Sequence, residues 1–333
     1  MENERKYLNV LMGLLILLVV VGHFGQTVTN SMPGIAKSIF GGGILFIYLF
    51  HMPMFLFVSG YLSRDVEKRR DKAFSDLFLP YLYFQIFCGI CYWIANKNNM
   101  YLQNIFLPIM GAWYLFTLFC YRLLLPNLIK VKYILFISIL LTVFACAFIG
   151  MDKTFAIRKS LGFLVYFLAG YYMNSKGLSS FIKQYPKMIP LVLLLVELLC
   201  IITILTKYDI YPIWLSVLTR SVDMKSFGHW YLAPIIYLVT FIMTSVTSWL
   251  VLQVIPQSNR FLEHLGADTM PMYLSHLILF MAVACIGNKS NVLLTVSTSS
   301  LCIILSLALF SCEWYKKLFH KIISQLTALF MDA

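Results

Sequence analysis

The chain has 333 residues, of which 60% are hydrophobic and only 12% are charged, with a mean hydropathy of +0.82. This composition excludes a water-soluble globular protein, in which about a quarter of the residues are charged. The 26 Lys and Arg residues outnumber the 14 Asp and Glu residues. In a membrane protein such an excess indicates cytoplasmic loops facing anionic lipid, so we expect no nucleic-acid partner.

Apolar runs of bilayer-spanning length recur along the whole chain. The first follows a short charged segment and resembles a signal peptide, but it lacks a small-residue cleavage site, so we expect it to remain as the first helix. The ten predicted spans cover 8–28, 42–62, 74–94, 110–126, 131–150, 157–174, 188–206, 230–254, 268–287 and 292–313. The stretch 208–220 contains Asp209, Pro212 and Arg220 and is too short to span, so it is predicted to be interfacial or re-entrant.

The distribution of basic residues predicts the orientation of these spans. With a cytoplasmic N-terminus, ten spans place 17 of the 26 Lys and Arg residues on the cytoplasmic side and nine on the other. This bias predicts that both termini are cytoplasmic. The predicted fold class is therefore an all-α, polytopic membrane helical bundle, with residues 1–333 as a single transmembrane domain and no soluble extracytoplasmic domain.

Four ionisable side chains inside the apolar runs define the candidate site, because such groups are costly at membrane depth and usually functional. They are His23, His51 next to the helix-kinking Pro53, Glu197 and His276. Two imidazoles at a similar depth, His23 and His51, favour chemistry, because neutral imidazole accepts a proton near pH 7. Bridging of two helices by hydrogen bonds is the alternative for each histidine, and for His276 both interpretations stay open. For Glu197 we favour a structural role, as a protonated or a helix-pairing carboxyl.

A basic loop follows the second span. Residues 64–72 carry five cations, among them Lys68, Arg69, Arg70 and Lys72. Such a cluster at a bilayer can bind phosphates, including those of coenzyme A. The alternative is a topology anchor of the kind that short cytoplasmic loops provide. The eight cysteines lie in apolar runs, where cysteine behaves as a small hydrophobe, so neither disulfides nor a metal site is predicted.

Short motifs occur in a fixed order between residue 7 and about residue 280. They are 7–13 leading to Gly22-His23, then Phe50-His51-Met52-Pro53, Ser59-Gly60-Tyr61, Leu79-Pro80-Tyr81, Ala112-Trp113-Tyr114-Leu115, the segment 163–172, and the segment 266–276 that ends at His276. In this order they resemble the acyltransferase-3 family of bacterial membrane enzymes. Independently of the resemblance, Ser59 and Gly60 predict a close helix approach with a hydroxyl hydrogen bond.

The resemblance implies a ten-helix, multi-pass enzyme of the bacterial cytoplasmic membrane. Such an enzyme moves an acyl group, commonly acetyl, from cytoplasmic acyl-CoA (acetyl-CoA) to a hydroxyl of a cell-surface or lipid-linked carbohydrate. The resemblance makes His23 the catalytic residue, and we interpret His51 as a second catalytic residue that orients it or contacts substrate. Trp113, Arg122 and His276 are interpreted as substrate-binding or structural polar residues. The expected partners are membrane lipids, the carbohydrate acceptor and a glycan-assembly enzyme.

The chain departs from the family pattern near His23. The family usually has an arginine or lysine separated from the histidine by ten residues, and this chain has Met12 there. Asn9 stands where an acidic residue is common. Three explanations stay open. Either another cation, such as Arg122, takes the place of the missing one, or the acyl donor is handled differently, or catalysis is weakened or lost. The competing class is a non-catalytic glycan or lipid exporter on the same scaffold.

Overall fold

The structure, a computed structural model, describes residues 2–95, 107–145, 154–174, 186–221, 230–286 and 291–330. Regular structure in these ranges is helical, with no strand, as the predicted all-α class requires. The chain divides into two compact units. Unit 1 comprises Met1–Val58, Met173–Thr219 and Val239–Lys317, and unit 2 comprises Ser59–Tyr172, Arg220–Leu238 and Leu318–Ala333.

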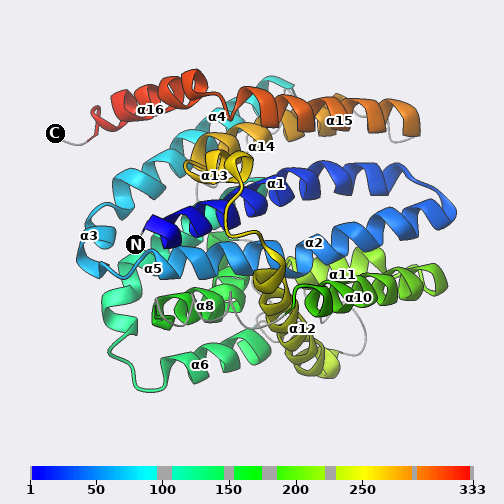
Figure 1. The fold of residues 1–333 in the computed structure, drawn as a ribbon. Coiled ribbons are helices and arrows are strands. Elements are labelled where there is room, and N and C mark those ends of the chain that lie inside the picture. Colours follow the sequence, from blue (N-terminus) through cyan, green and yellow to red (C-terminus); the bar gives the residue numbers. More distant parts are fainter. Residues whose placement is uncertain are drawn as a thin grey trace. The chain divides into compact units, whose positions relative to one another are not determined.

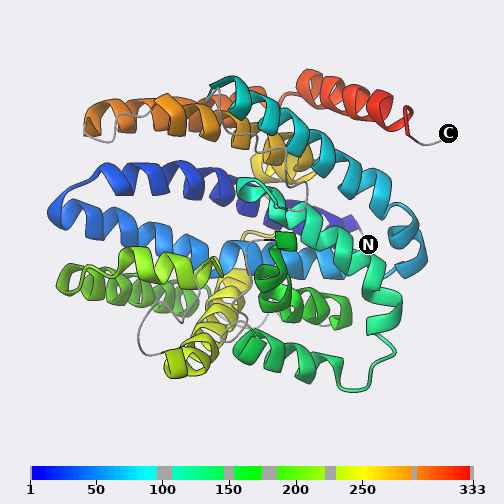
Figure 2. The same ribbon diagram turned by 180° about the vertical axis from the view of Figure 1, so that it is seen from behind.

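The helices of unit 1 include most of the long apolar ones (Figure 1). They are α1 (Glu2–Ser31), α2 (Gly34–Tyr61, up to Val58), α10 (Met188–Lys207), α11 (Tyr211–Leu218), α12 (Ala233–Val254, from Val239), α13 (Arg260–Gly266), α14 (Met270–Ile286), α15 (Val292–Leu309) and the start of α16 (Glu313–Thr327). Figures 1 and 2 show α1 and α2 as neighbouring antiparallel helices. Met32 and Pro33 lie between the two helices, and α2 begins at Gly34, whose φ of +53° suits glycine.

Unit 2 is built from shorter helical segments. They are α3 (Val66–Asp71), the π-helical η1 (Phe74–Phe78), α4 (Leu79–Ala95), η3 (Met110–Ala112), α5 (Trp113–Leu128), α6 (Ile134–Leu140), η4 (Leu141–Ala145), η5 (Thr154–Ala156), α8 (Ile157–Tyr172) and η7 (Trp230–Leu232). Within the unit, α5 packs against α3, η1 and α8, and α6 and η4 pack against α8. The α5 helix is therefore central to this unit.

Every predicted span contains a described helix, and six of these helices are long and apolar enough to cross a membrane. The six are Glu4–Ser31, Gly34–Tyr61, Phe74–Cys91, Met188–Lys207, Ala233–Val254 and Val292–Leu309. This finding identifies a membrane protein, while ten spans and cytoplasmic termini stay predictions. The α11 helix lies within 208–220 and has only eight residues, a length of about 12 Å that is too short to span a bilayer.

Glycines set a close crossing between α1 and α13. A Cβ atom at Gly13 would lie 1.9 Å from the carbonyl oxygen of Leu262, and one at Gly266 would lie 1.8 Å from that of Asn9. The α13 helix begins at a side-chain cap, in which the Leu262 amide donates to the Asn259 carboxamide at 3.0 Å. The crossing thus holds α1, the helix that carries His23, at a fixed distance from α13.

We expect Gly13→Ala to destabilise unit 1, because the added methyl group would overlap the Leu262 backbone. Overpacking of this kind costs about 1–3 kcal/mol, and thermal melting of the purified protein in one detergent would measure it. The matched control is Gly43→Ala, where a Cβ atom meets nothing within 4 Å and the usual helical preference for alanine is expected. Equal melting temperatures for the two variants would contradict the proposed crossing.

The close helix approach predicted at Ser59 and Gly60 is present in unit 2. A Cβ atom at Gly60 would lie 1.9 Å from the carbonyl oxygen of Phe167 in α8. The Ser59 hydroxyl lies 2.8 Å from the hydroxyl of Tyr114 in α5. Both predicted features, the small residue and the hydroxyl hydrogen bond, thus join the end of α2 to the helices of unit 2.

Candidate functional site

Two imidazoles meet in unit 1, one from α1 and one from α14. The Nδ1 atom of His23 lies 2.9 Å from the Nε2 atom of His276. The two rings are stacked, with their centroids 5.2 Å apart and an interplanar angle of 16°. The His276 side chain is fully buried and that of His23 is half-buried. The structure therefore joins two residues that are 253 positions apart in the sequence.

A backbone carbonyl determines which ring nitrogens carry protons. The Nδ1 atom of His276 lies 2.9 Å from the carbonyl oxygen of Met272, which can only accept, so Nδ1 of His276 carries the proton. In the neutral ring, its Nε2 atom must then accept a hydrogen bond from Nδ1–H of His23. The lone pair of the neutral His23 ring is thereby assigned to Nε2. A chain of hydrogen bonds of this kind can orient an imidazole so that its other nitrogen acts as a base, as in a catalytic triad.

Aromatic rings surround the two histidines. Phe280 packs against His23 with ring centroids 5.5 Å apart, and Tyr273 packs edge-on against His276 at 5.9 Å. Next to His276 on α14, the Ser275 hydroxyl lies 2.5 Å from the Tyr315 hydroxyl. Hydrogen bonds are stronger in such a water-poor environment than in water, so these surroundings hold His23 and His276 in one arrangement.

His51 has a different environment from the one we expected. Its Nδ1 atom donates to the carbonyl oxygen of Ile47 on the same helix at 2.7 Å. Its ring packs nearly perpendicular to the ring of Tyr48, with the two centroids 4.9 Å apart. The Tyr48 hydroxyl in turn lies 3.3 Å from the Gln26 side-chain oxygen. The Nδ1–H group of His23 thus donates to His276 and not to His51, and the catalytic role of His51 stays a prediction.

Glu197 joins two helices of unit 1. Its Oε1 atom lies 2.7 Å from the hydroxyl of Thr247, which places α10 beside α12. The same hydroxyl lies 2.8 Å from the Met243 carbonyl oxygen one turn earlier in α12. This geometry corresponds to the helix-pairing carboxyl that the sequence favours.

The predicted basic loop folds largely as the short helix α3. Arg69 is anchored, because its Nε atom donates to the Leu62 carbonyl oxygen at 3.1 Å. Arg70 forms ion pairs with Glu67 at 2.9 Å and with Asp71 at 3.5 Å. The side chains of Lys68, Arg70 and Lys72 are exposed. These cations thus remain accessible at the surface of unit 2.

Arg122 belongs to the same cationic cluster. It lies on α5, against which α3 and η1 pack, and its charge is repelled by Arg69 and attracted by Asp76. Only 8% of Arg122 is exposed, and its Nε atom is buried with no hydrogen-bond partner among the described residues. A buried guanidinium donor of this kind is costly unless an acceptor reaches it.

Trp113 is the first residue of α5 and lies nine residues before Arg122. Its ring stacks on Phe163 with centroids 5.4 Å apart, and the ammonium group of Lys159 lies 5.0 Å from its centroid. Only 9% of Trp113 is exposed. Of the two interpretations offered by the sequence, the packing favours a structural residue.

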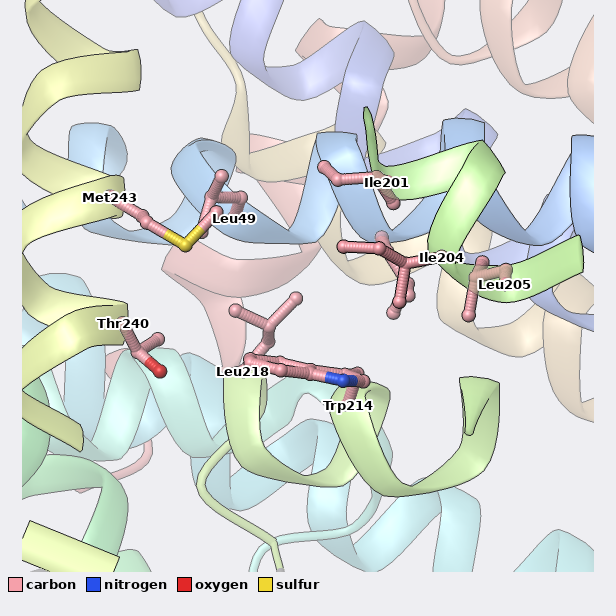
Figure 3. A pocket seen from close by; sticks show the side chains of 9 residues that line it. Leu49, Ile201, Ile204, Leu205, Trp214, Leu218, Thr240 and Met243 are labelled. Carbon is pink, nitrogen blue, oxygen red and sulfur yellow. The ribbon is translucent and has the colours of Figure 1, made fainter. Parts of the chain in front are cut away.

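An apolar cavity in unit 1 was not predicted from the sequence. It has a volume of about 120 Å³ and lies between α2, α10, α11 and α12 (Figure 3). The side chains that line it are Leu45, Leu49, Ile201, Ile204, Leu205, Trp214, Leu218, Thr240 and Met243. Short apolar helices such as α11 can thus support a cavity without crossing the bilayer.

These features define a helical membrane protein with a hydrogen-bonded pair of imidazoles in one unit and a cationic cluster in the other. The profile of the acyltransferase-3 family, described as an acyltransferase domain, matches residues 5–311, and the chain belongs to this family. The match includes both histidines, α3 and Arg122. No curated protein and no solved structure shows significant similarity to the chain.

Proposed function

We propose that the chain is an O-acyltransferase of the bacterial cytoplasmic membrane. It moves an acyl group, acetyl in the simplest case, from cytoplasmic acyl-CoA to a hydroxyl of a cell-surface or lipid-linked carbohydrate. The observation that carries this proposal is the hydrogen bond from His23 to His276, because it assigns a lone pair to the Nε2 atom of His23. Membership of an acyltransferase family supplies the reaction class.

The reaction follows from general base catalysis. The Nε2 atom of His23 takes the proton of the acceptor hydroxyl, and the oxygen attacks the thioester carbonyl carbon. The resulting tetrahedral oxyanion collapses, the carbon–sulfur bond breaks, and the ester is released. The departing thiolate of coenzyme A recovers the proton from Nε2. His276 stabilises the imidazolium form of His23 in between, because its Nε2 atom accepts from Nδ1–H.

The donor requires a place for its phosphates. The cluster of Lys68, Arg69, Arg70, Lys72 and Arg122 supplies guanidinium and ammonium donors in unit 2. Arginine is well suited to this task because its planar group binds phosphate oxygens in a bidentate manner. We therefore assign the cluster to acyl-CoA, and no metal is required by this scheme.

Arg122→Gln is expected to weaken coenzyme A binding by about 10-fold or more, the effect of losing a charge-assisted hydrogen bond. Isothermal titration of the purified full chain with coenzyme A would measure the change. The control is Arg260→Gln, which removes an exposed arginine of unit 1. Equal weakening by both substitutions would indicate a general effect of charge, and no weakening by Arg122→Gln would contradict the donor assignment.

The competing function is a glycan or lipid exporter that retains this scaffold. The observation that favours it is Met12, which stands where the family usually has a cation. An exporter needs no general base, so the two functions differ in what the cell envelope contains.

Mass spectrometry of surface glycans and lipid-linked sugars distinguishes the two functions. We expect cells without the gene to lose one ester-sized mass while the underlying glycan is still present. Accumulation of unexported glycan, with the ester pattern unchanged, would overturn the acyltransferase proposal in favour of export.

A further inference from the structure

Arg220 is a buried cation that the proposed mechanism does not use. It is the first residue of the segment Arg220–Leu238 of unit 2 and comes two residues after the end of α11. Only 3% of it is exposed. Its Nε and Nη1 atoms are buried with no hydrogen-bond partner among the described residues. Burying such donors without an acceptor is costly, so these two N–H groups favour an anionic partner.

Aromatic rings hold this guanidinium in place. Its central carbon lies 4.4 Å from the ring centroid of Tyr237 and 5.9 Å from that of Phe163. The face of an aromatic ring attracts a cation but offers no strong acceptor for its N–H donors. The rings therefore position Arg220, but they do not supply a hydrogen-bond acceptor for its Nε and Nη1 atoms.

The backbone of Arg220 adds a second observation. Its φ angle is +53°, in the left-handed region that a residue with a side chain seldom occupies. Strained conformations of this kind persist where the surrounding structure imposes them, often at ligand-binding positions. Here the conformation accompanies a guanidinium that lies against Tyr237 and Phe163.

Other basic residues of unit 2 lie near Phe163. Phe163 also stacks on Trp113, over which Lys159 lies, and Arg158 is the neighbouring residue on α8. The described acidic residues of unit 2 are Asp65, Glu67, Asp71 and Asp76. All four lie in or next to α3 and η1, by the first cationic cluster.

The two cationic clusters lie toward opposite ends of α5. Trp113 opens this helix and Arg122 follows nine residues later, a separation of about 13 Å along the helix axis. In the predicted topology the Arg122 end is cytoplasmic and the Trp113 end faces outward. A donor with phosphates can thus bind at one end, while the other end offers a second, separate place for an anion.

We propose that the Arg220 guanidinium, held by Tyr237 and Phe163, is a subsite for a phosphate group of a membrane-bound acceptor such as a lipid-linked sugar. A phosphate offers the paired oxygens that a guanidinium binds in a bidentate manner. The burial of Arg220 among aromatic rings favours an acceptor that is itself in the membrane over a soluble acidic glycan. This subsite deepens the proposed function and rests on it for the identity of the acceptor.

Ligand-induced thermal stabilisation tests the subsite without requiring turnover. The full chain would be placed in nanodiscs of phosphatidylcholine and titrated with N-acetylglucosamine-1-phosphate, with N-acetylglucosamine and glucuronate as comparison ligands. We expect a saturable rise of about 2–4 °C in melting temperature with the sugar phosphate alone. Arg220→Asn should abolish the rise, since asparagine tolerates the left-handed backbone but cannot bind phosphate in this way. Arg220→Lys should retain part of it.

Two further variants separate this subsite from other anion effects. Arg260→Asn, at an exposed arginine of unit 1, should keep the full rise. Arg122→Gln should keep it too, because that residue belongs to the other cluster. A rise that survives Arg220→Asn would overturn the proposal. Stabilisation by phosphatidylglycerol in the nanodisc, with none by the sugar phosphate, would also overturn it and identify a bulk lipid headgroup instead. Because binding is measured, loss of acyl transfer alone would leave these outcomes unchanged.

Discussion

His23→Asn is expected to reduce acyl transfer by about 100-fold to 10,000-fold, the usual contribution of a general base. Asparagine retains a polar side chain of similar size but has no basic nitrogen near pH 7. The measurement is the amount of the ester-sized mass on envelope carbohydrates in a deletion strain complemented with each variant. Western blotting of membranes must show equal amounts of protein.

His320→Asn is the matched control for this substitution. His320 lies on an exposed position of α16, outside the imidazole pair, so the same chemical change is expected to leave acylation unchanged. An exporter should tolerate both substitutions. Acylation at the wild-type level in the His23→Asn strain would show that His23 is not the general base and would favour the exporter function.

The helices were predictable because hydropathy acts locally. Each of the ten predicted apolar runs contains a helix, since a chain in lipid must satisfy its backbone hydrogen bonds within the segment. The ends were less predictable: α1 begins at Glu2, six residues before its apolar run. Its first turn is polar and is stabilised by an ion pair between Lys6 and Glu2 at 2.8 Å. Hydropathy does not register such a turn.

The pairing within the candidate site was not predictable from the sequence. His23, His51 and His276 were all identified, because an ionisable group in an apolar run is conspicuous. Which two meet depends on the rotation of α1 about its axis, and that is set by the crossing of Gly13 and Gly266. Depth alone favoured His51 as the neighbour of His23, but depth does not determine which face of a helix carries a residue.

Two other features were missed for different reasons. Arg220 was treated only as a charge that prevents 208–220 from spanning, because its aromatic neighbours come from distant segments. The α16 helix follows the last predicted span, and its exposed Trp314, Leu318 and Ile322 recur at a spacing of four residues. That period was masked by the polar residues between them, which keep the mean hydropathy of the segment low.

His276→Leu is expected to lower kcat by about 10-fold to 100-fold and to change the KM for acyl-CoA by less than about 2-fold. Leucine fills the buried space but cannot accept from Nδ1–H of His23, so the proton is no longer confined to Nδ1 and the imidazolium loses a stabilising partner. His276 acts through His23 and is thus a positioning residue. Initial rates at varied acyl-CoA, in membranes that contain the natural acceptor, would measure both constants.

His276→Gln separates positioning from mere packing. The glutamine side chain has an oxygen that can accept from Nδ1–H of His23, so it should recover most of the lost kcat. A structural role alone predicts that the two variants lose stability and activity in parallel, because both replace a fully buried ring. Recovery of kcat by glutamine at equal thermal stability would support the relay from Met272 through His276 to His23. Equal loss of kcat in both variants would leave His23 without a positioning partner and contradict the assigned tautomer.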